Sequence, residues 1–393
     1  MFGHDIIVTD KLSWWEQKYH QLFQYLDREK GNTMNTLFIA GMGGRIFNCT
    51  LRALANQEKI TQLYGVSASG WKDLVQIVEK IEHDSTHRFF PIDVYPDDVA
   101  EEDKISEGHF GYLVFIKTDG NALCFRHKVP VFAAPDPGTL PLAELGIDVA
   151  IDATGKFLTK ENAQSFLDAG AKKVIMSAPA KDDTALVIYG INDEKDNGLS
   201  IVSRASCTTT CAAPIVQALG DIYGMPKNIF LNTTHAVTNS QFSLDGNAQK
   251  FANGFGCMDN IVVTDTGATA SLQKMFPEIE NTFGISCRVP VTDGSILSLV
   301  MEFKEEGRSQ ELNKENVLTT LREYGRTHPL NLEVSPRKTM VSTYVIGKGV
   351  GSIVAPGQIV VLGNTVHVIA GYDNEYGYAF LLALSALEAP LPV

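Results

Sequence analysis

Short apolar runs alternate with helical periodicities through the first half of the chain. Strands are predicted at 36–40, 62–67, 149–155 and 173–179, and helices at 46–54 and 160–169. Each strand is brief and almost wholly apolar, as expected for strands that are covered on both faces. The alternation predicts a mostly parallel sheet with helices on both of its faces.

The pattern changes after residue 207. A helix predicted at 212–223 leads into longer segments at 295–303 and 358–369, in which apolar and polar residues alternate as in antiparallel strands. A last helical run, 379–387, could return to the first sheet. We therefore predict an α/β domain over 36–206, completed by a C-terminal helix within 374–393, and an α+β catalytic domain over 207–373 with a mostly antiparallel sheet.

Residues 1–35 form a predicted helical extension. Ser13 and Glu16 have the spacing of a capping box, and Trp15, Tyr19, Leu22 and Leu26 follow at helical intervals until Gly31. Such a stripe usually packs on its own domain, and a partner-binding helix is the alternative.

Composition narrows the function classes. The 393 residues contain 44% hydrophobic and 20% charged residues, with a net charge of −13. The negative charge argues against general binding to nucleic acid or to an anionic membrane. We find no apolar run long enough to span a bilayer and no secretory signal, and the six cysteines are thinly spread. We expect a cytoplasmic protein without a metal site.

A glycine cluster follows the first predicted strand. Gly41 and Gly43 occupy the first two positions of a dinucleotide-binding turn, and the third falls on Ile46 or Phe47. The position expected to carry a ribose-binding carboxylate is Ser69, close to Ser67 and Lys72, which would suit a 2′-phosphate better. The cluster predicts a Rossmann-type dinucleotide-binding domain, and a tight turn without a nucleotide is the alternative.

Cys207 lies between a predicted strand and a predicted helix. The positive end of a helix dipole lowers a thiol pKa, so we expect a thiolate here. His235 ends a strand 28 residues later, where it could act as the base of a Cys–His pair. A lone cysteine is usually an inert core residue. Cys207 becomes a candidate nucleophile only because His235 is available as its base.

The segment Ala205–Pro214 resembles the active-site segment of glyceraldehyde-3-phosphate dehydrogenases. The resemblance runs from about residue 36 to the C-terminus, and seven further anchors follow the family's order. They are Asp84–His87, Thr154–Gly155, Ser177–Pro179, His235–Thr238, Thr266–Ala268, Arg288–Pro290 and Tyr372–Tyr378.

The resemblance implies a role for each site residue. Cys207 would attack an aldehyde and become a thioester, with His235 as general base. Substrate and phosphate contacts would come from Ser206, Thr208, Thr238, Thr266 and Arg288. Contacts to NAD or NADP would come from Gly41, Gly43, Arg45, Ile46, Ser69, Thr154, Ser177, Asn374 and Tyr378. Members of this family are usually homotetramers that act on a small phosphorylated aldehyde, so a homo-oligomer with such a substrate is expected.

The chain also departs from the family pattern. Thr210 replaces an asparagine, and the loop 249–259 lacks the arginines that border the attacking-phosphate site, with Lys250 as its only cation. We therefore hypothesise that phosphate releases the acyl group poorly and that NADP is tolerated or preferred. Erythrose 4-phosphate oxidation, oxidation without phosphate, and a pseudoenzyme or assembly protein are the alternatives to glyceraldehyde 3-phosphate oxidation.

Overall fold

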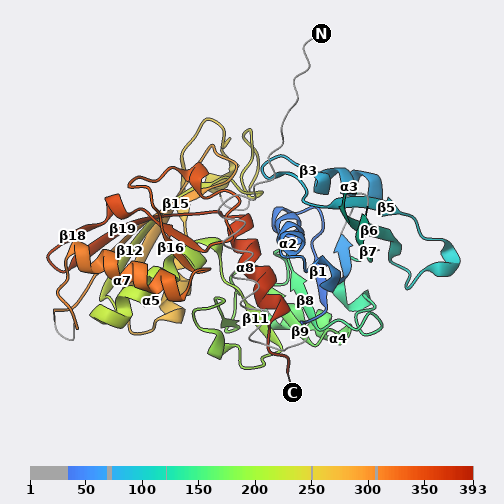
Figure 1. The fold of residues 1–393 in the computed structure, drawn as a ribbon, viewed down its shortest axis with the longest axis horizontal. Helices are drawn as coiled ribbons and strands as arrows, with labels where there is room; N and C mark the ends of the chain where they lie inside the picture. The colour runs from blue at the N-terminus through green and yellow to red at the C-terminus, as the bar shows by residue number, and fades with distance from the viewer. Residues whose placement is uncertain (1–33, 69–72, 121, 249–250, 306–308, 393) are drawn as a thin grey trace, which may run out of the picture. The chain divides into compact units, whose positions relative to one another are not determined.

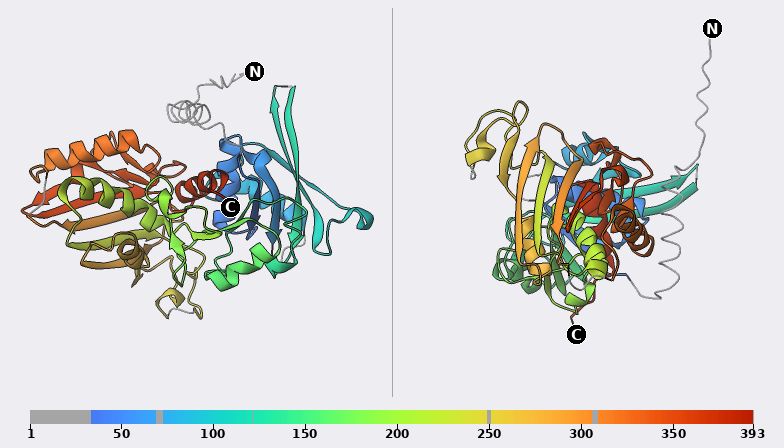
Figure 2. Two further views of the ribbon diagram at one scale, coloured as in Figure 1. Left: turned by 90° about the horizontal axis from the view of Figure 1, so that it is seen from below. Right: turned by 90° about the vertical axis from the view of Figure 1, so that its left-hand side faces the viewer.

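A computed structural model describes residues 34–68, 73–120, 122–248, 251–305 and 309–392. The predicted N-terminal helix, Ser69, Lys72 and Lys250 lie outside these residues. The described chain belongs to one compact unit, 35–393, which contains two large sheets. Figures 1 and 2 show these sheets with the helices that cover them.

The first sheet has nine strands in the order β10-β11-β9-β8-β1-β2-β7-β6-β5. Neighbours from β10 to β7 are parallel, and the pairs β7–β6 and β6–β5 are antiparallel. The strands are β1 (Leu37–Ala40), β2 (Leu63–Ala68), β5 (Asp93–Asp97), β6 (His109–Asp119), β7 (Ala122–Ala133), β8 (Val149–Asp152), β9 (Lys173–Met176), β10 (Ala185–Leu186) and β11 (Ile201–Ser203).

Helices cover this sheet because its central strands are apolar on both sides. All four residues of β1 and of β8 are buried. The covering helices include α2 (Arg45–Asn56), α3 (Leu74–Glu82), α4 (Lys160–Asp168) and α8 (Tyr376–Leu387). Every residue of α8 is buried, and this last helix packs along α2, at the start of the described chain (Figure 1).

The second sheet has eight strands and is mostly antiparallel. Its order is β13-β14-β12-β15-β19-β17-β16, with β18 paired to β19, and only β12–β14 and β16–β17 are parallel. The strands are β12 (Asn228–Ala236), β13 (Val262–Asp265), β14 (Asn281–Val289), β15 (Ser295–Glu302), β16 (Leu332–Val334), β17 (Ser352–Val354), β18 (Val360–Leu362) and β19 (Thr365–Tyr372). The predicted fold class, α/β with a second α+β sheet, is confirmed.

One face of the second sheet packs on helices α5 (Cys207–Tyr223), α6 (Ala268–Met275) and α7 (Lys314–Thr327). Leu297, Leu299 and Met301 point from β15 into this core and are fully buried. The remaining elements are the short pair β3 (His83–Asp84) and β4 (Arg88–Phe89) and seven one-turn 3₁₀ helices, at 60–62, 101–103, 137–139, 193–195, 251–254, 342–344 and 356–358.

Three segments differ from the sequence predictions. The run 358–369 is not one strand but the hairpin of β18 and β19, because Gly363, at φ +57°, turns the chain. The helix predicted from Ala212 begins earlier, at Cys207, since Ser206 caps it. The long hairpin of β6 and β7 was not predicted; its strands are antiparallel to each other and lie between β2 and the edge strand β5.

Candidate active site

The turn before α5 sets the position of Cys207. Ala205 is buried with φ +55°, a conformation that costs a non-glycine residue about 1–3 kcal/mol. Ser206 then caps α5 by accepting from the Thr209 amide at 3.2 Å. The cap starts the helix at Cys207, whose sulfur lies at the helix N-terminus as the sequence predicted.

His235 faces Cys207 from the end of β12. Its Nε2 lies 3.5 Å from Cys207 Sγ, at the outer limit of a hydrogen bond to sulfur. The imidazole is buried, and its Nδ1 lies 2.7 Å from the Ala236 carbonyl oxygen. The two side chains that the sequence analysis paired are therefore in contact.

The expected thiolate is not supported by the surroundings of Cys207. Burial raises the pKa of the Cys207 thiol to about 11, although Arg288 nearby lowers it. Burial and the Arg288 cation lower the pKa of His235 to about 3. Both shifts favour the neutral forms, a thiol on Cys207 and a neutral imidazole on His235, and burial is the largest cause of each.

Tyr372 connects the two elements that carry this pair. Its hydroxyl is 2.9 Å from Thr208 Oγ1 on α5 and 2.7 Å from Thr233 Oγ1 on β12. The ring also packs edge-on against His235, with centroids 5.9 Å apart. In the sequence, Tyr372 was noted only as the first residue of the anchor Tyr372–Tyr378. No pattern there indicated that its hydroxyl joins α5 and β12.

Arg288 stands beside His235 because β12 and β14 run parallel in register. The register pairs His235 directly with Arg288. Arg288 Nη1 lies 2.7 Å from His235 Nδ1 and donates to the Ala236 carbonyl oxygen at 3.1 Å. Its Nε is buried without a hydrogen-bond partner. The predicted phosphate-binding cation thus lies at the Cys–His pair.

Asn374 is joined to the same pair through Ser295. The Ser295 hydroxyl accepts from the Ala236 amide at 3.1 Å and donates to Asn374 Oδ1 at 2.7 Å. This bond uses the oxygen of Asn374 and leaves its NH₂ end to donate to a ligand. The residue expected to orient the nicotinamide is therefore two hydrogen bonds from the backbone next to His235.

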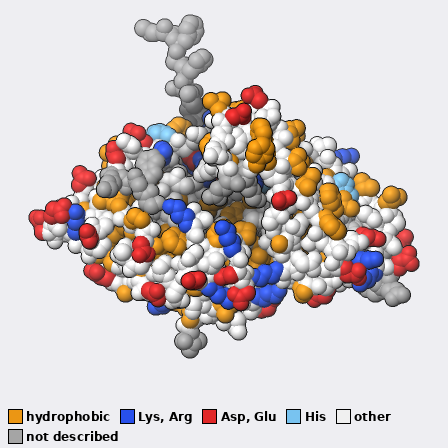
Figure 3. All heavy atoms as spheres, turned by 180° about the vertical axis from the view of Figure 1, so that it is seen from behind, with side chains coloured by type: hydrophobic (Ala, Val, Ile, Leu, Met, Phe, Trp, Pro, Cys, Tyr) orange, Lys and Arg blue, Asp and Glu red, His pale blue; other side chains and the backbone are white. Residues whose placement is uncertain are grey.

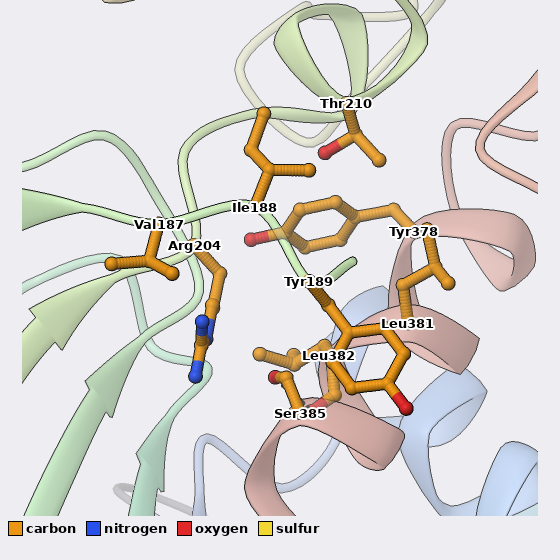
Figure 4. A pocket seen from close by; sticks show the side chains of 9 residues that line it. All are labelled: Val187, Ile188, Tyr189, Arg204, Thr210, Tyr378, Leu381, Leu382 and Ser385. Carbon is orange, nitrogen blue, oxygen red and sulfur yellow. Dashed lines mark hydrogen bonds between the residues drawn. The ribbon is translucent and has the colours of Figure 1, made fainter. Parts of the chain in front are cut away.

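Tyr378 packs behind the nucleophile turn. Its hydroxyl donates to the Ala205 carbonyl oxygen at 3.4 Å. Tyr378, Arg204 and Thr210 line a small cavity of about 10 Å³, drawn in Figure 4. Arg204 is buried and bonded to Asp196, and its Nε and Nη1 have no partner. A cavity of this size holds about one water molecule, which would satisfy those donors.

The candidate cofactor crevice lies between β1 and β8, where the strand order reverses. Gly41, at φ +106°, follows β1, and a Cβ there would stand 2.7 Å from the carbonyl carbon of Ala153 after β8. Helix α2 begins at Arg45 and Ile46 without a side-chain cap or an acidic residue in its first turn. Such an uncapped helix start suits a pyrophosphate.

Four further predicted cofactor residues surround this crevice in different ways. Gly43 is exposed in the turn before α2. Thr154 follows β8, where its hydroxyl donates to Asp152 Oδ1 at 2.5 Å, and Ser177 follows the neighbouring β9. The Arg45 side chain is turned inward and forms ion pairs with Asp84 and Glu375. The Arg45 side chain is therefore engaged with these two carboxylates at the start of α2.

The hydroxyls predicted to bind phosphate are mostly engaged within the protein. Those of Ser206 and Thr208 bond to Thr209 and Tyr372, respectively. Thr238 lies exposed after β12, where its amide donates to Gln241. Thr266 Oγ1 accepts from the Ala268 amide at the start of α6.

The loop that lacks arginines is held by its own polar groups. Gly256 donates to Asp245 Oδ1 at 2.8 Å, and Gly246 donates to the Gly254 carbonyl oxygen at 2.8 Å. Phe251 and Phe255 pack edge to face at 5.4 Å. The described part of this loop carries the rings of Phe251 and Phe255 and no arginine, whereas the family resemblance led us to expect arginines here.

A buried acidic cluster beside the site was missed by sequence reasoning. Asp373 accepts three backbone N–H bonds, and burial still raises its pKa. Burial and the neighbouring carboxylates raise the pKa of Asp293 far above the ordinary range. His87 Nε2 lies 3.3 Å from Glu375 and 3.6 Å from Asp293. A metal ion could bridge such atoms, but Arg45 and backbone amides already bond to Glu375 and Asp373.

A nucleotide-type sheet joined to a sheet that carries a Cys–His pair defines a class of two-domain, thiol-dependent dehydrogenases. The sequence profile described as "Glyceraldehyde 3-phosphate dehydrogenase, C-terminal domain" matches residues 206–374. Glyceraldehyde-3-phosphate dehydrogenase 1 of Kluyveromyces lactis is 35% identical over 280 residues, which cover 70% of this chain and 83% of the yeast protein.

Bacterial relatives are similar at the same level. The glyceraldehyde-3-phosphate dehydrogenase of Bacteroides fragilis is 35% identical over 66% of this chain and 78% of its own length. Glyceraldehyde-3-phosphate dehydrogenase 2 of Staphylococcus aureus is 32% identical over 87% of this chain and 92% of its own length. The chain belongs to the glyceraldehyde-3-phosphate dehydrogenase family, and the prediction of a dehydrogenase of this type is confirmed.

Proposed function

We propose that this enzyme oxidises a small phosphorylated aldehyde, glyceraldehyde 3-phosphate, with NAD or NADP through a thioester on Cys207. The observation that carries the proposal is the contact of 3.5 Å between Cys207 Sγ and His235 Nε2. The guanidinium of Arg288 lies beside this pair, and its Nε has no hydrogen-bond partner. These three groups supply a nucleophile, a base and an anion-binding cation within one site.

The protein's part in the chemistry is a set of proton transfers at His235. With Nδ1–H donating to the Ala236 carbonyl, Nε2 accepts the thiol proton and Cys207 attacks the aldehyde carbon. The new oxyanion then takes the proton from Nε2. His235 removes that proton again as the carbon loses its hydride, and the thioester remains on Cys207. The Cys207 amide at the start of α5 is suitably placed to stabilise the oxyanion.

The residues present fit a nicotinamide cofactor. The glycine turn after β1 brings the backbone next to Ala153, where a Cβ would collide, and the first turn of α2 is uncapped. When bound, the nicotinamide supplies the hydride acceptor. Asn374 would donate its NH₂ group to the carboxamide, and Tyr378 would close the site behind the ring. Ser69, outside the described residues, is the position on which the choice between NAD and NADP depends.

Release of the acyl group is the second part of the proposal. The hydroxyls of Ser206 and Thr208 are engaged inside the protein, and the described loop 251–257 has no arginine or lysine. Loss of one charged donor from an anion site costs on the order of 1.5–3 kcal/mol, about ten- to a hundredfold in affinity. We infer that inorganic phosphate binds weakly and that water competes for the thioester.

The test measures nicotinamide reduction with glyceraldehyde 3-phosphate, with each cofactor and with and without phosphate. We expect reduction by the native enzyme, none by Cys207→Ser, and continued turnover without phosphate. Absence of any reduction with either cofactor would contradict the proposed activity and favour the pseudoenzyme alternative. Strict dependence on phosphate, with an acyl phosphate as product, would contradict the proposed hydrolysis while leaving the oxidation intact. Erythrose 4-phosphate serves as the competing substrate.

We further propose that the enzyme is a homo-oligomer. The face of the second sheet that turns away from α5 carries exposed apolar side chains on adjacent strands: Phe230 on β12, Phe283 and Ile285 on β14, and Val263 on β13. Asp and Glu side chains are otherwise interspersed with Lys and Arg, as on the face drawn in Figure 3. A row of adjacent exposed apolar residues is typical of a subunit interface. A second copy of this chain is the proposed occupant.

A further inference from the structure

Three buried carboxyl groups lie next to Asn374 or to its hydrogen-bond partner. Asp373 and Glu375 are the neighbours of Asn374 in sequence. Asp293 lies two residues before Ser295, whose hydroxyl donates to Asn374 Oδ1 at 2.7 Å. Each of the three acidic residues is less than a tenth exposed. The position of Asn374, the residue expected to orient the nicotinamide, therefore depends on how these carboxyl groups are held.

Two of the carboxyl groups have donors for their charge, and Asp293 does not. The Asp373 carboxylate accepts three backbone N–H bonds, and Glu375 forms an ion pair with Arg45. Asp293 Oδ1 accepts from the Gly294 amide at 2.7 Å, whereas its Oδ2 is buried and has no hydrogen-bond partner among the described residues. A buried carboxylate oxygen without a donor costs free energy, so this geometry favours a neutral Asp293.

Asp373 is the acceptor that a proton on Asp293 would reach. The two side chains are placed for a mutual hydrogen bond, which exists only when one of them is protonated. His87 Nε2 lies 3.6 Å from Asp293 Oδ2 and closer, at 3.3 Å, to Glu375. Burial, followed by the charges of Asp373 and Glu375, raises the pKa of Asp293, in agreement with a retained proton. The other titratable or charged groups of this cluster are Arg45 and Cys49 on α2 and Asp84 in β3.

The turn after Asp293 connects this carboxyl group to Ser295. Gly294 has φ +82°, and a Cβ there would stand 2.5 Å from the Ser342 carbonyl oxygen, so the turn is packed closely against the chain. Ser295 follows directly and bonds to Asn374 Oδ1. A shift of Asp293 would therefore reach Asn374 through one tight turn and one hydrogen bond.

We propose that Asp293 is a positioning residue that shares one proton with Asp373 and thereby holds Asn374 in place for the nicotinamide. The inference rests on the proposed function and adds a residue that has no assigned contact with substrate or cofactor. Loss of the proton would leave two carboxylates side by side, and their repulsion would separate the turn at Asp293 from the segment that carries Asn374. After burial, an ionised Asp293 is also among the causes that raise the pKa of the Cys207 thiol. The neutral acid therefore suits both the cofactor site and the nucleophile.

Infrared spectroscopy of ¹³C-aspartate-labelled enzyme tests the shared proton directly. A protonated carboxyl group absorbs at a higher frequency than a carboxylate, and the spectrum of Asp293→Asn is subtracted from that of the native enzyme at pH 7. We expect the native enzyme to show one protonated band that the variant lacks. A missing carboxylate band in its place would mean that Asp293 is ionised and would overturn the proposal. The measurement needs no turnover, so its result stands whether or not the proposed oxidation does.

The effect on Asn374 is tested by the KM for the cofactor that supports turnover, measured at pH 7 and at pH 10. We expect this KM to rise about tenfold in the native enzyme as the shared proton is lost, because Asn374 loses alignment. Asp293→Asn keeps a donor to Asp373 at every pH and should show no such rise. Asp293→Ala has no donor and should show the raised KM already at pH 7.

The control variant is Asp119→Asn, at the exposed end of β6, which should follow the native enzyme at both pH values. Circular dichroism at pH 10 establishes that each protein is still folded. Equal rises in KM for the native enzyme and Asp293→Asn would refute the role of Asp293, and this comparison does not depend on whether Asp293→Ala folds. A failure of all variants and of the native enzyme to reduce either cofactor would count against the proposed function instead.

Discussion

Tyr372 is the residue on which the geometry of the Cys–His pair depends most directly. Its hydroxyl is bonded to one threonine on the nucleophile helix and to another on the strand of the base, and all three groups are buried. Burial raises the pKa of the Cys207 thiol, so the thiol needs a base to remove its proton. Catalysis therefore depends on how accurately His235 is held against the sulfur.

Replacing Tyr372 with Phe should slow the enzyme and weaken the fold. The change leaves the hydroxyls of Thr208 and Thr233 without their shared partner, at a cost of about 1–3 kcal/mol in the free energy of unfolding. We expect kcat to fall about tenfold, with little change in KM, because the pair loses alignment. Steady-state kinetics and denaturant unfolding measure both effects. Tyr324→Phe on α7 removes a hydroxyl far from the pair, and an equal loss of kcat there would contradict this reasoning.

Asp293 gives the fold a pH dependence. Its pKa is raised in the folded protein, mainly by burial and then by Asp373 and Glu375, so the folded carboxyl holds a proton that the unfolded chain releases above pH about 4. The unfolded state thus binds fewer protons, and this group's contribution to stability is lost as pH rises.

Asp293→Asn should therefore stabilise the protein, and more so at pH 8 than at pH 5. Asparagine has the shape of the protonated acid and has no charge to bury. Thermal unfolding at both pH values measures the difference in Tm. The exposed Asp259→Asn is the control and should show no pH-dependent gain. A lower Tm for Asp293→Asn at pH 8 would show that the ionised carboxylate is the stable form.

The chemistry of the candidate site was predictable from the sequence at some residues and hidden at others. Cys207 and His235 could be paired because both lie where elements begin or end, at positions that motifs mark. The contact between Arg288 and His235 depends on a parallel register between strands that are 53 residues apart in sequence. Local patterns contain no information on that register, and the direction of the Cys207 pKa depends on burial, which is tertiary.

At the level of elements, the starts of α3, α4, α5 and α7 follow from capping side chains. Asn313 caps α7 by accepting from the Asn316 amide at 3.0 Å, as Ser206 caps α5. Strands β1, β2, β8 and β9 of the first sheet were predictable because short apolar runs of this length, flanked by turn residues and alternating with helical patterns, favour buried strands. The hairpin of β18 and β19 was not separated into two strands, since Gly363-Asn364 interrupts an otherwise continuous alternation.

Asn313→Ala should lower the free energy of unfolding by about 1 kcal/mol, the usual cost of losing a cap. Helix α7 packs on β16 and α5 and carries neither residue of the Cys–His pair, so activity at room temperature should be unchanged. Asn313→Ser, which keeps a capping oxygen, should restore most of the stability. A loss of activity without a loss of stability would show that α7 has a role in the site.

At the scale of the whole molecule, the exposed apolar row on β12, β14 and β13 is the proposed subunit interface. We expect Phe283→Asp to convert the oligomer into smaller species, because a buried charge at an apolar interface costs several kcal/mol. Light scattering coupled to gel filtration measures the mass. Leu123→Asp, at the exposed end of β7, is a matched change that should leave the mass unaltered. A native enzyme that is already monomeric would contradict the proposed oligomer.

Among the described residues, no helix combines the length and the hydropathy that a membrane span requires. Helix α8 is shared by the two halves of the fold, because it packs along α2 and β8 of the first sheet and also contacts α5, which packs on the second sheet.

That shared helix has a consequence for biosynthesis. Asn35, just before β1, donates to the carbonyl oxygens of Ala386 and Ala389 at the end of α8. The last parallel strand of the first sheet, β11, ends at Ser203, roughly 180 residues before α8 is complete. At about 5–20 residues per second, ribosomes need on the order of ten to forty seconds to make that length. During this interval the apolar face of α2 that α8 later buries stays exposed to solvent. The nascent chain should therefore bind chaperones until α8 has been synthesised.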